Sequence, residues 1–239
     1  AQTQDPDVHD RADAHLNLSD ARLKDIDPGK IPLWLKIFVA AWAAVLVPSY
    51  AVDSGYGLLW LCNVGQILTV FGLCTENRLL VSMAAVGNVP WLLLWCVHMT
   101  AELAGVMLDR GVLEGPASYM FNPDYPLYAR ILSIYHGWLP FVLLFALKRL
   151  GYDRRAFFLE TLLAWTLILA AYIIVPNADT PAGNVNLVFG YTADRDPVLW
   201  VNRPLWIAIV MLASPLVLYL PMHLFYKRFF VPTRSSQPD

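Results

Sequence analysis

The sequence predicts an all-α, polytopic membrane protein, and three observations lead to this fold class. Hydrophobic residues make up 57% of the 239-residue chain and charged residues 15%, against about 45–50% and 25% in soluble domains. Six long apolar stretches fill most of the chain, and Lys and Arg gather on alternate connections between them. About 20 apolar residues of helix cross a bilayer core roughly 30 Å thick, so we expect a bundle of six transmembrane helices.

The six predicted spans leave room for only short connections on one side of the membrane. The connections Thr75–Arg78 and Lys148–Arg155 predict antiparallel helix pairs, whereas residues 109–125 and 176–197 predict longer outer loops. Asp153 is the expected N-cap of the fifth span. The transmembrane domain, residues 31–229, comprises Ile31–Ala51, Gly55–Cys74, Leu79–Leu108, Pro126–Leu147, Ala156–Val175 and Val198–Phe229.

Basic residues predict the orientation of this domain. One side holds only Arg110, Arg130, Arg195 and Arg203, while the remaining Lys and Arg residues lie on the side that carries both chain ends. Because cytoplasmic loops carry the excess of Lys and Arg, we expect both termini in the cytoplasm. An odd number of spans would split this clustering.

Composition also excludes several classes of protein. The net charge of −2 leaves no basic surface for phosphates, so nucleic acid is not an expected partner. Cys62, Cys74 and Cys96 lie in apolar stretches without CxxC spacing, which is not a disulfide framework. The first 30 residues are polar and acidic, so no signal peptide is expected. The lack of an internal repeat disfavours an inverted-repeat transporter.

Polar tails flank the predicted transmembrane domain at residues 1–30 and 230–239. The N-terminal tail is rich in Asp and lacks an apolar period, which is typical of a segment that is disordered alone. A partner surface is the simplest way to order such tails. We therefore expect protein partners at both ends, in addition to the lipid bilayer.

Polar side chains recur in the outer half of three predicted spans. In the third span they step by three and four residues and form one stripe. The 1.5 Å rise per residue places the three groups at similar depth, where ionisable groups are costly and mark function. We expect a polar cavity that opens toward the outer leaflet, lined by Asn63, Gln66, Asn88 and Ser133. The alternative is that these four form hydrogen bonds between helices. The residues concerned are Cys62, Asn63 and Gln66, then Asn88, Trp91, Trp95, His98 and Glu102, and then Ser133 and His136.

Three chemistries could use these residues. Cys62 and His136 could form a thiolate–imidazole pair for acyl transfer, although a buried Cys is often only a small hydrophobe. His98, Glu102 and His136 could bind a metal, or His98 and Glu102 could simply pair with each other. His136 could be an axial ligand to haem or a chlorin-type pigment, or a structural histidine. The sequence leaves the cofactor unknown.

Glu160 lies near the inner end of the fifth span. Arg154 and Arg155 precede it by about one and a half turns. This spacing predicts an ion pair at the membrane surface.

Several strings in the chain, within roughly residues 55–190, resemble a family of bacterial six-helix membrane proteins described as membrane-associated and uncharacterised. The resemblance implies a six-helix fold in the bacterial inner membrane and brings no known activity. The architecture is also similar to that of six-helix intramembrane acyl hydrolases and acyltransferases, which implies catalytic roles for Cys62 and His136. The strings are Leu61-Cys62-Asn63, Arg78-Leu79-Leu80-Val81-Ser82-Met83-Ala84-Ala85-Val86-Gly87, Leu132-Ser133-Ile134-Tyr135-His136 with Leu139-Pro140, Gly151-Tyr152-Asp153-Arg154-Arg155-Ala156, and Asn184-Val185-Asn186-Leu187-Val188-Phe189-Gly190.

Two functional hypotheses follow. The first is a non-catalytic integral subunit of a larger membrane complex, in an accessory or scaffold role. The second is an intramembrane enzyme that acts on a lipid or other apolar substrate through Cys62 and His136. Whether the chain is an enzyme is therefore open at this point.

Overall fold

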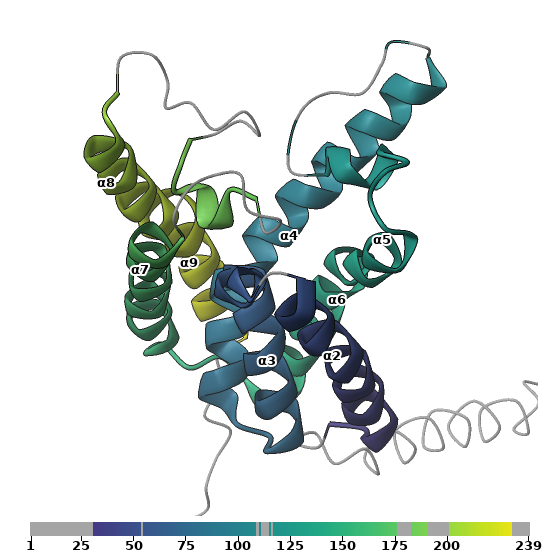
Figure 1. Cartoon of the computed structure of the whole chain (residues 1–239). Helices are drawn as coiled ribbons and strands as arrows, with labels where there is room; N and C mark the ends of the chain where they lie inside the picture. Colours follow the sequence, from purple (N-terminus) through teal and green to yellow (C-terminus); the bar gives the residue numbers. More distant parts are fainter. Residues whose placement is uncertain are drawn as a thin grey trace, which may run out of the picture. The chain divides into compact units, whose positions relative to one another are not determined.

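The computed structural model describes residues 31–53, 55–108, 110, 115, 117–175, 183–190 and 201–230. The expectations for the N-terminal tail, for most of the C-terminal tail and for parts of both long loops lie outside these residues. Within the described residues the structure is helical and contains no strand (Figure 1). The predicted all-α class is therefore confirmed for this part of the chain.

Short connections join α3 to α4 and α6 to α7, whereas longer ones separate α4 from α5 and α7 from α8 (Figure 1). Four of the elements, marked η, are single turns of 3-10 helix or, for η4, a π-helical segment. In chain order the elements are α2 (Leu33–Asp53), η1 (Tyr56–Leu59), α3 (Leu61–Cys74), α4 (Arg78–Met107), η2 (Ser118–Phe121), α5 (Leu127–Ser133), α6 (Tyr135–Leu150), α7 (Ala156–Ile174), η3 (Val185–Leu187), α8 (Arg203–Ala213), η4 (Ser214–Tyr219) and α9 (Leu220–Phe229).

Five helical segments of the described chain are long and apolar enough to cross a membrane. They are Leu33–Val52, Arg78–Met107, Leu127–Leu150, Ala156–Ile174 and Arg203–Phe229. The predicted second span is instead divided into η1 and the 14-residue α3, with the extended residue Trp60 between them. The described chain is thus helical, with five segments that could span a membrane.

Helix α4 lies at the centre of the bundle. It packs against α3, α6 and α7, and η4 and α9 also contact it. Its inward face carries small and branched apolar residues, among them Val81, Ala84, Ala85 and Val89, all at most 1% exposed. These residues let three helices approach closely, which is the usual basis of helix packing in lipid.

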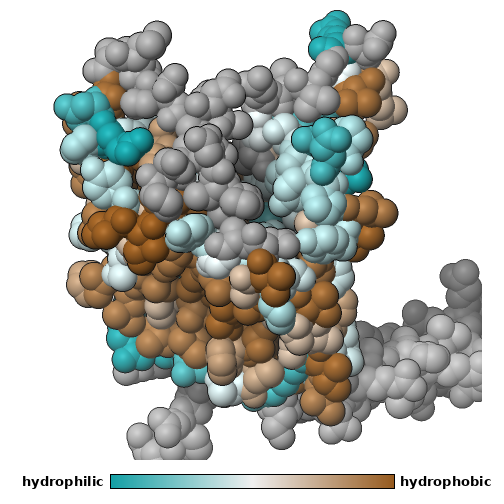
Figure 2. All heavy atoms as spheres, viewed as in Figure 1, coloured by the Kyte–Doolittle hydropathy of each residue, from teal (hydrophilic) through white to brown (hydrophobic). Residues whose placement is uncertain are grey.

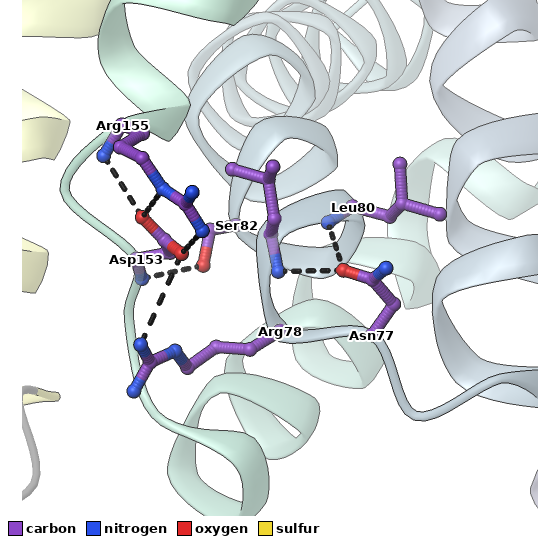
Figure 3. A network of polar contacts seen from close by, with 7 residues as sticks. Asn77, Arg78, Leu80, Ser82, Asp153 and Arg155 are labelled. Carbon is purple, nitrogen blue, oxygen red and sulfur yellow. Dashed lines mark hydrogen bonds and ion pairs between the residues drawn. The ribbon is translucent and has the colours of Figure 1, made fainter.

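Two tight connections, residues 75–78 and 151–155, and the end of α9 at residues 227–230 form one end of the bundle. We call this end the basic end. Asn77 caps α4 here, because its Oδ1 accepts hydrogen bonds from the N–H groups of Leu79 (2.9 Å) and Leu80 (3.2 Å) (Figure 3). The opposite end, near η1, η2 and η3, is called the loop end below.

Asp153 joins two of these connections (Figure 3). Its backbone N–H donates to Ser82 Oγ (2.9 Å), and its carboxylate accepts from Arg155 Nε (3.1 Å) and Nη2 (2.8 Å). Arg78 Nη2 lies 3.9 Å from the same carboxylate. The expected N-cap role of Asp153 needs a correction, since the residue that directly precedes α7 is Arg155. The carboxylate accepts instead from the backbone N–H of Arg155 (3.0 Å), just before the helix begins.

Prolines inside helices release backbone carbonyls that neighbouring helices then use. Proline has no N–H, so the carbonyl four residues earlier loses its usual helical donor. Pro140 precludes the usual donor to the His136 carbonyl, which lies 3.5 Å from Cys96 Sγ of α4. Pro215 does the same to Met211, whose carbonyl accepts from Trp165 Nε1 of α7 (2.6 Å). These bonds tie α4 to α6 and α7 to α8.

Hydrophobic side chains cover much of the face seen in Figure 2, and hydrophilic side chains gather along its lower edge. Exposed apolar residues such as Phe141 (72%) and Ile173 (77%) belong to helices of spanning length. A surface of this kind is suited to lipid.

Candidate functional site

Buried polar side chains gather at the loop end of the bundle, contributed by α2, α3, η2, α5 and α6. The hydroxyl, thiol and amide groups there lie within hydrogen-bonding or electrostatic reach of one another. We call this set the loop-end cluster and define it as Tyr50, Cys62, Asn63, Tyr119, Ser133, Tyr135 and His136.

Asn63 connects three elements within the cluster. Its Nδ2 donates to the carbonyl of Gly57 in η1 (2.7 Å), and its Oδ1 accepts from the Tyr135 hydroxyl of α6 (3.2 Å). Asn63 is 1% exposed and Tyr135 is fully buried. The predicted interhelical hydrogen bonding therefore describes Asn63 well.

Ser133 lies among tyrosines. Its hydroxyl donates to the Ala129 carbonyl of its own helix (2.8 Å), and the hydroxyls of Tyr50 and Tyr119 approach it from α2 and η2. Burial raises the pKa of Tyr119, which lies outside the spanning segments. Its phenol is therefore a neutral hydrogen-bonding group.

His136 is held in one tautomer. Its Nδ1 lies 2.7 Å from the Ser133 carbonyl, which can only accept, so Nδ1 carries the hydrogen and neutral Nε2 keeps a lone pair. The break between α5 and α6 makes this bond available, because Gly137 N–H bonds to Ile134 (2.9 Å) rather than to Ser133. The ring stacks on Trp95 at 4.8 Å between centroids. His136 can thus act as a base or as a ligand through Nε2.

Cys62 lies beside Tyr135. The Tyr135 hydroxyl is within reach of the Cys62 thiol, and Tyr50 is also close. In the described part of the chain no hydrogen bond joins Cys62 to His136. The two residues of the predicted catalytic pair thus belong to one cluster, without a hydrogen bond between them, and their catalytic role stays a prediction.

His98 and Glu102 form a pair on α4, as one of the two readings of the sequence expected. Nδ1 of His98 is 2.9 Å from Oε1 of Glu102, whose side chain is 0% exposed. Gly115 packs so closely on His98 that a Cβ there would overlap Nε2. Among the described residues no three His, Cys, Asp or Glu side chains are grouped as a metal site. His136 does not join this pair, and a metal at the three residues stays a prediction of the sequence, as does a haem or chlorin at His136.

The remaining members of the predicted polar cavity are packed between α3 and α4. Asn88 donates to the Ala84 carbonyl of its own helix (3.0 Å) and fills the space left by the missing side chain of Gly65. Gln66 is 0% exposed, and neither its Oε1 nor its Nε2 has a hydrogen-bond partner in the described part. A shallow pocket of about 340 Å³ lies elsewhere, lined by Pro48, Ser49, Val52 and Tyr128.

Asn186 has a positioning role that sequence reasoning missed. It adopts a left-handed conformation (φ 52°) and uses both ends of its amide, accepting from Leu61 N–H (3.0 Å) and donating to the Leu59 carbonyl (2.8 Å). It thereby fixes the start of α3, directly before Cys62 and Asn63. The sequence signal for this role is an Asn in a predicted loop, since Asn tolerates the left-handed conformation better than most residues.

The expected ion pair of Glu160 needs a correction. Arg155 binds Asp153, and Glu160 is 2% exposed with no ion pair in the described part. The spacing along the helix was sufficient for contact, but the side chain turns into the bundle against Gly87.

Comparison of the chain with protein-family models, curated proteins and solved structures finds no match.

Proposed function

We propose that this protein is a non-catalytic integral subunit of a larger membrane complex, in an accessory or scaffold role. In this proposal it spans a bacterial inner membrane six times, with both chain ends in the cytoplasm. The proposal depends chiefly on one observation, the loop end of helix α4.

Helix α4 is longer than a membrane crossing requires. Its 30 residues correspond to about 45 Å at 1.5 Å per residue, against a hydrocarbon core of roughly 30 Å. At a tilt of about 40°, the upper end of the usual range, it would still rise about 34 Å. Arg78 at the basic end is bound to Asp153, which favours a headgroup position for that end. The excess length therefore falls at the loop end.

The residues at the loop end of α4, where the excess length falls, are apolar and exposed. Val106 is 45% exposed, Met107 78% and Leu108, directly after the helix, 64%. In Figure 1 this end of α4 extends beyond the bundle, beside η2. Apolar side chains beyond the hydrocarbon core favour contact with protein over contact with water. We propose that an apolar surface of a second membrane protein covers them.

Two further features support six crossings with the basic end in the cytoplasm. Residues 56–74, η1 and α3 together, correspond to about 29 Å at the helical rises of the two elements. That length is close to the thickness of the hydrocarbon core. Arg154, Arg155, Lys227 and Arg228 also lie at the basic end, on the side where the positive-inside rule places the cytoplasm.

Site-specific photocrosslinking in native membranes tests this proposal. A photoreactive amino acid at Met107 should give one discrete protein adduct. The matched control is Phe141, which is similarly exposed at 72% but lies near the middle of a span and should label lipid. Equal lipid labelling at both positions, with no protein adduct, would contradict the proposal.

A second candidate function is an intramembrane acyl hydrolase or acyltransferase. It is favoured by the His136 tautomer, because the free Nε2 lone pair could take the Cys62 proton. The thiolate would then attack an ester carbonyl, the alcohol would leave with that proton, and a second acceptor or water would release the acyl group. Since Cys62 and His136 do not share a hydrogen bond, we place this candidate second.

Labelling with an acyl probe separates the second candidate from the first. The enzyme hypothesis requires an acyl adduct on Cys62 that disappears in Cys62→Ala and forms more slowly in His136→Ala. Cys96→Ala is the matched control, because its thiol lies 3.5 Å from the backbone carbonyl of His136 and not beside the free nitrogen. An unlabelled Cys62 in the folded protein would exclude the enzyme.

A further inference from the structure

Among the described residues, one carboxyl group lies inside the bundle without a counter-charge. Glu160 is in the second turn of α7 and is 2% exposed. Its carboxyl packs directly on the backbone of α4 at Gly87, where a Cβ would overlap Oε1. The group therefore lies between two spanning helices and is shielded from both water and lipid.

One uncharged polar group, the Tyr219 hydroxyl, faces this carboxyl, and a second, the Trp91 indole, lies beside that hydroxyl. Tyr219, at the end of η4, is fully buried and lies within electrostatic reach of Glu160 and of Trp91. Trp91 lies one turn after Gly87 on α4. In the described part of the chain Oε2 of Glu160, the Tyr219 hydroxyl and the Trp91 indole N–H have no hydrogen-bond partner of normal geometry. Three unsatisfied buried polar groups at one place are unusual in a native protein.

The charged groups on the surrounding elements are engaged elsewhere. α7 packs against α4, α8, η1, η3 and η4. On α4, Arg78 binds Asp153 and Glu102 pairs with His98; on α8, Arg203 lies over the Phe189 ring. η3 carries no titratable side chain, and η1 carries only the Tyr56 phenol. On α9, which follows η4, His223 bonds to Tyr152 (2.7 Å). Tyr219 is therefore the titratable group that faces Glu160.

We propose that Glu160 is an intramembrane proton-binding site, with Tyr219 and Trp91 as its polar neighbours. A carboxylate takes up one proton from water and becomes the neutral acid, which is far less costly to bury than the ion. The acid can then donate to Tyr219 or accept from it. Ionisable groups inside spanning bundles commonly mark proton relays, and π-helical segments such as η4 frequently occur at functional sites.

Release of the proton would be coupled to packing. It would leave a carboxylate against the α4 backbone with no cation of the described residues within reach, a state that is expensive in the membrane. The ionised protein must then admit water or move η4 away from α7. The site thus links one proton to the contact between α4, α7 and η4.

Infrared spectroscopy of the whole purified protein in lipid nanodiscs tests the assignment. At neutral pH the spectrum should contain the carbonyl-stretch band of a protonated carboxyl, and Glu160→Gln should remove it. The matched control is Glu76→Gln, because Glu76 pairs with Lys36 at 2.7 Å at the basic end and should contribute no such band. Glu102→Gln identifies any contribution from the second buried carboxyl.

The substitution Tyr219→Phe tests whether the Tyr219 hydroxyl is a polar neighbour of Glu160. Loss of the hydroxyl should shift the band of Glu160 without abolishing it, since the carboxyl keeps its proton but changes its hydrogen bonding. Gln is nearly isosteric with Glu, so unchanged elution of Glu160→Gln from a sizing column verifies the fold. Identical spectra of the wild type and folded Glu160→Gln at neutral pH would overturn the proposal, because Glu160 would then be ionised.

Discussion

Two glycines of the bundle make room for polar side chains from neighbouring helices. Gly65 of α3 receives the Asn88 amide, and Gly87 of α4 receives the Glu160 carboxyl. A side chain at either position would overlap the polar group that now fills the space. These glycines therefore decide how closely α3 and α7 approach α4.

Gly65→Ala should destabilise the protein by about 1–3 kcal/mol, the usual range for overpacking a well-packed core. Gly137→Ala is the matched control, because nothing lies within 4 Å of a Cβ there. Alanine in a helix is favoured over glycine by about 1 kcal/mol, so the control should be neutral or slightly stabilised. Unfolding of both variants in mild detergent measures the difference. Equal stability of the two variants would contradict this role of Gly65, because the Asn88 side chain would then move aside without destabilising the protein.

The contacts of Asp153 predict that the free energy of unfolding depends on pH. Hydrogen bonds from Arg155, with Arg78 nearby, hold the pKa of the Asp153 carboxyl below its ordinary value of 3.8. A group with a lowered folded pKa stabilises the fold above its unfolded pKa and loses that contribution as the pH falls through the folded pKa. The wild type should therefore lose this stabilisation below about pH 4.

Thermal unfolding between pH 6 and pH 3 measures this effect, with Asp153→Asn as the test variant. The variant should be less stable than the wild type at neutral pH, and the difference should shrink as the pH falls. Asp124→Asn, at an exposed loop position, should follow the wild type throughout. A difference between wild type and Asp153→Asn that does not depend on pH would contradict the ionic role.

Single residues also show where sequence reasoning stopped. Asn63, Asn88, His98 and Glu102 were identified as polar groups at bilayer depth, and the structure buries or half-buries all four. The spacing to Arg155 predicts that Glu160 lies at the surface. Only the packing of α7 on Gly87 reveals that this side chain turns inward. Contacts between distant segments, such as Asn186 with Leu61, have no period or spacing that a sequence displays.

At the scale of elements, released carbonyls act as connectors between helices. The bond from Trp165 Nε1 to the Met211 carbonyl (2.6 Å) exists because Pro215 supplies no N–H to that carbonyl. Trp165→Phe should therefore leave a partly buried carbonyl unsatisfied and destabilise the protein by about 1–3 kcal/mol. In a Pro215→Ala background the helix can supply its own donor, so the same substitution should have a smaller effect. A double-mutant cycle on unfolding measures the coupling, and additive effects would contradict the connector role.

Most elements could be predicted, because spanning helices follow apolar length. Ala156 begins α7 as expected, and α4 is displaced by only one residue from its predicted start. The irregular places could not be predicted. The break at Ile134, the extended Trp60 before α3 and the π-helical turn of η4 each lie next to a hydrogen bond from a distant segment. Apolar length does not encode such bonds.

At the scale of the whole molecule, both proposals depend on helix α4. Its first two thirds form the core with α3, α6 and α7, and its last turn, with Val106 and Met107, is apolar and exposed. A central helix that extends past the hydrocarbon core is well placed to join a bundle to another protein. The subunit proposal and the proton site at Glu160 use different parts of this helix, so either can fail alone.

Gentle extraction from native membranes, followed by native mass measurement and identification of all chains, tests the proposed subunit role. We expect a particle much heavier than one chain with its detergent, with a partner protein in fixed ratio. That ratio should fall when Met107 and Val106 are both replaced by Ser, while Phe141→Ser leaves it unchanged. A homogeneous single-chain particle that remains folded would contradict the subunit proposal.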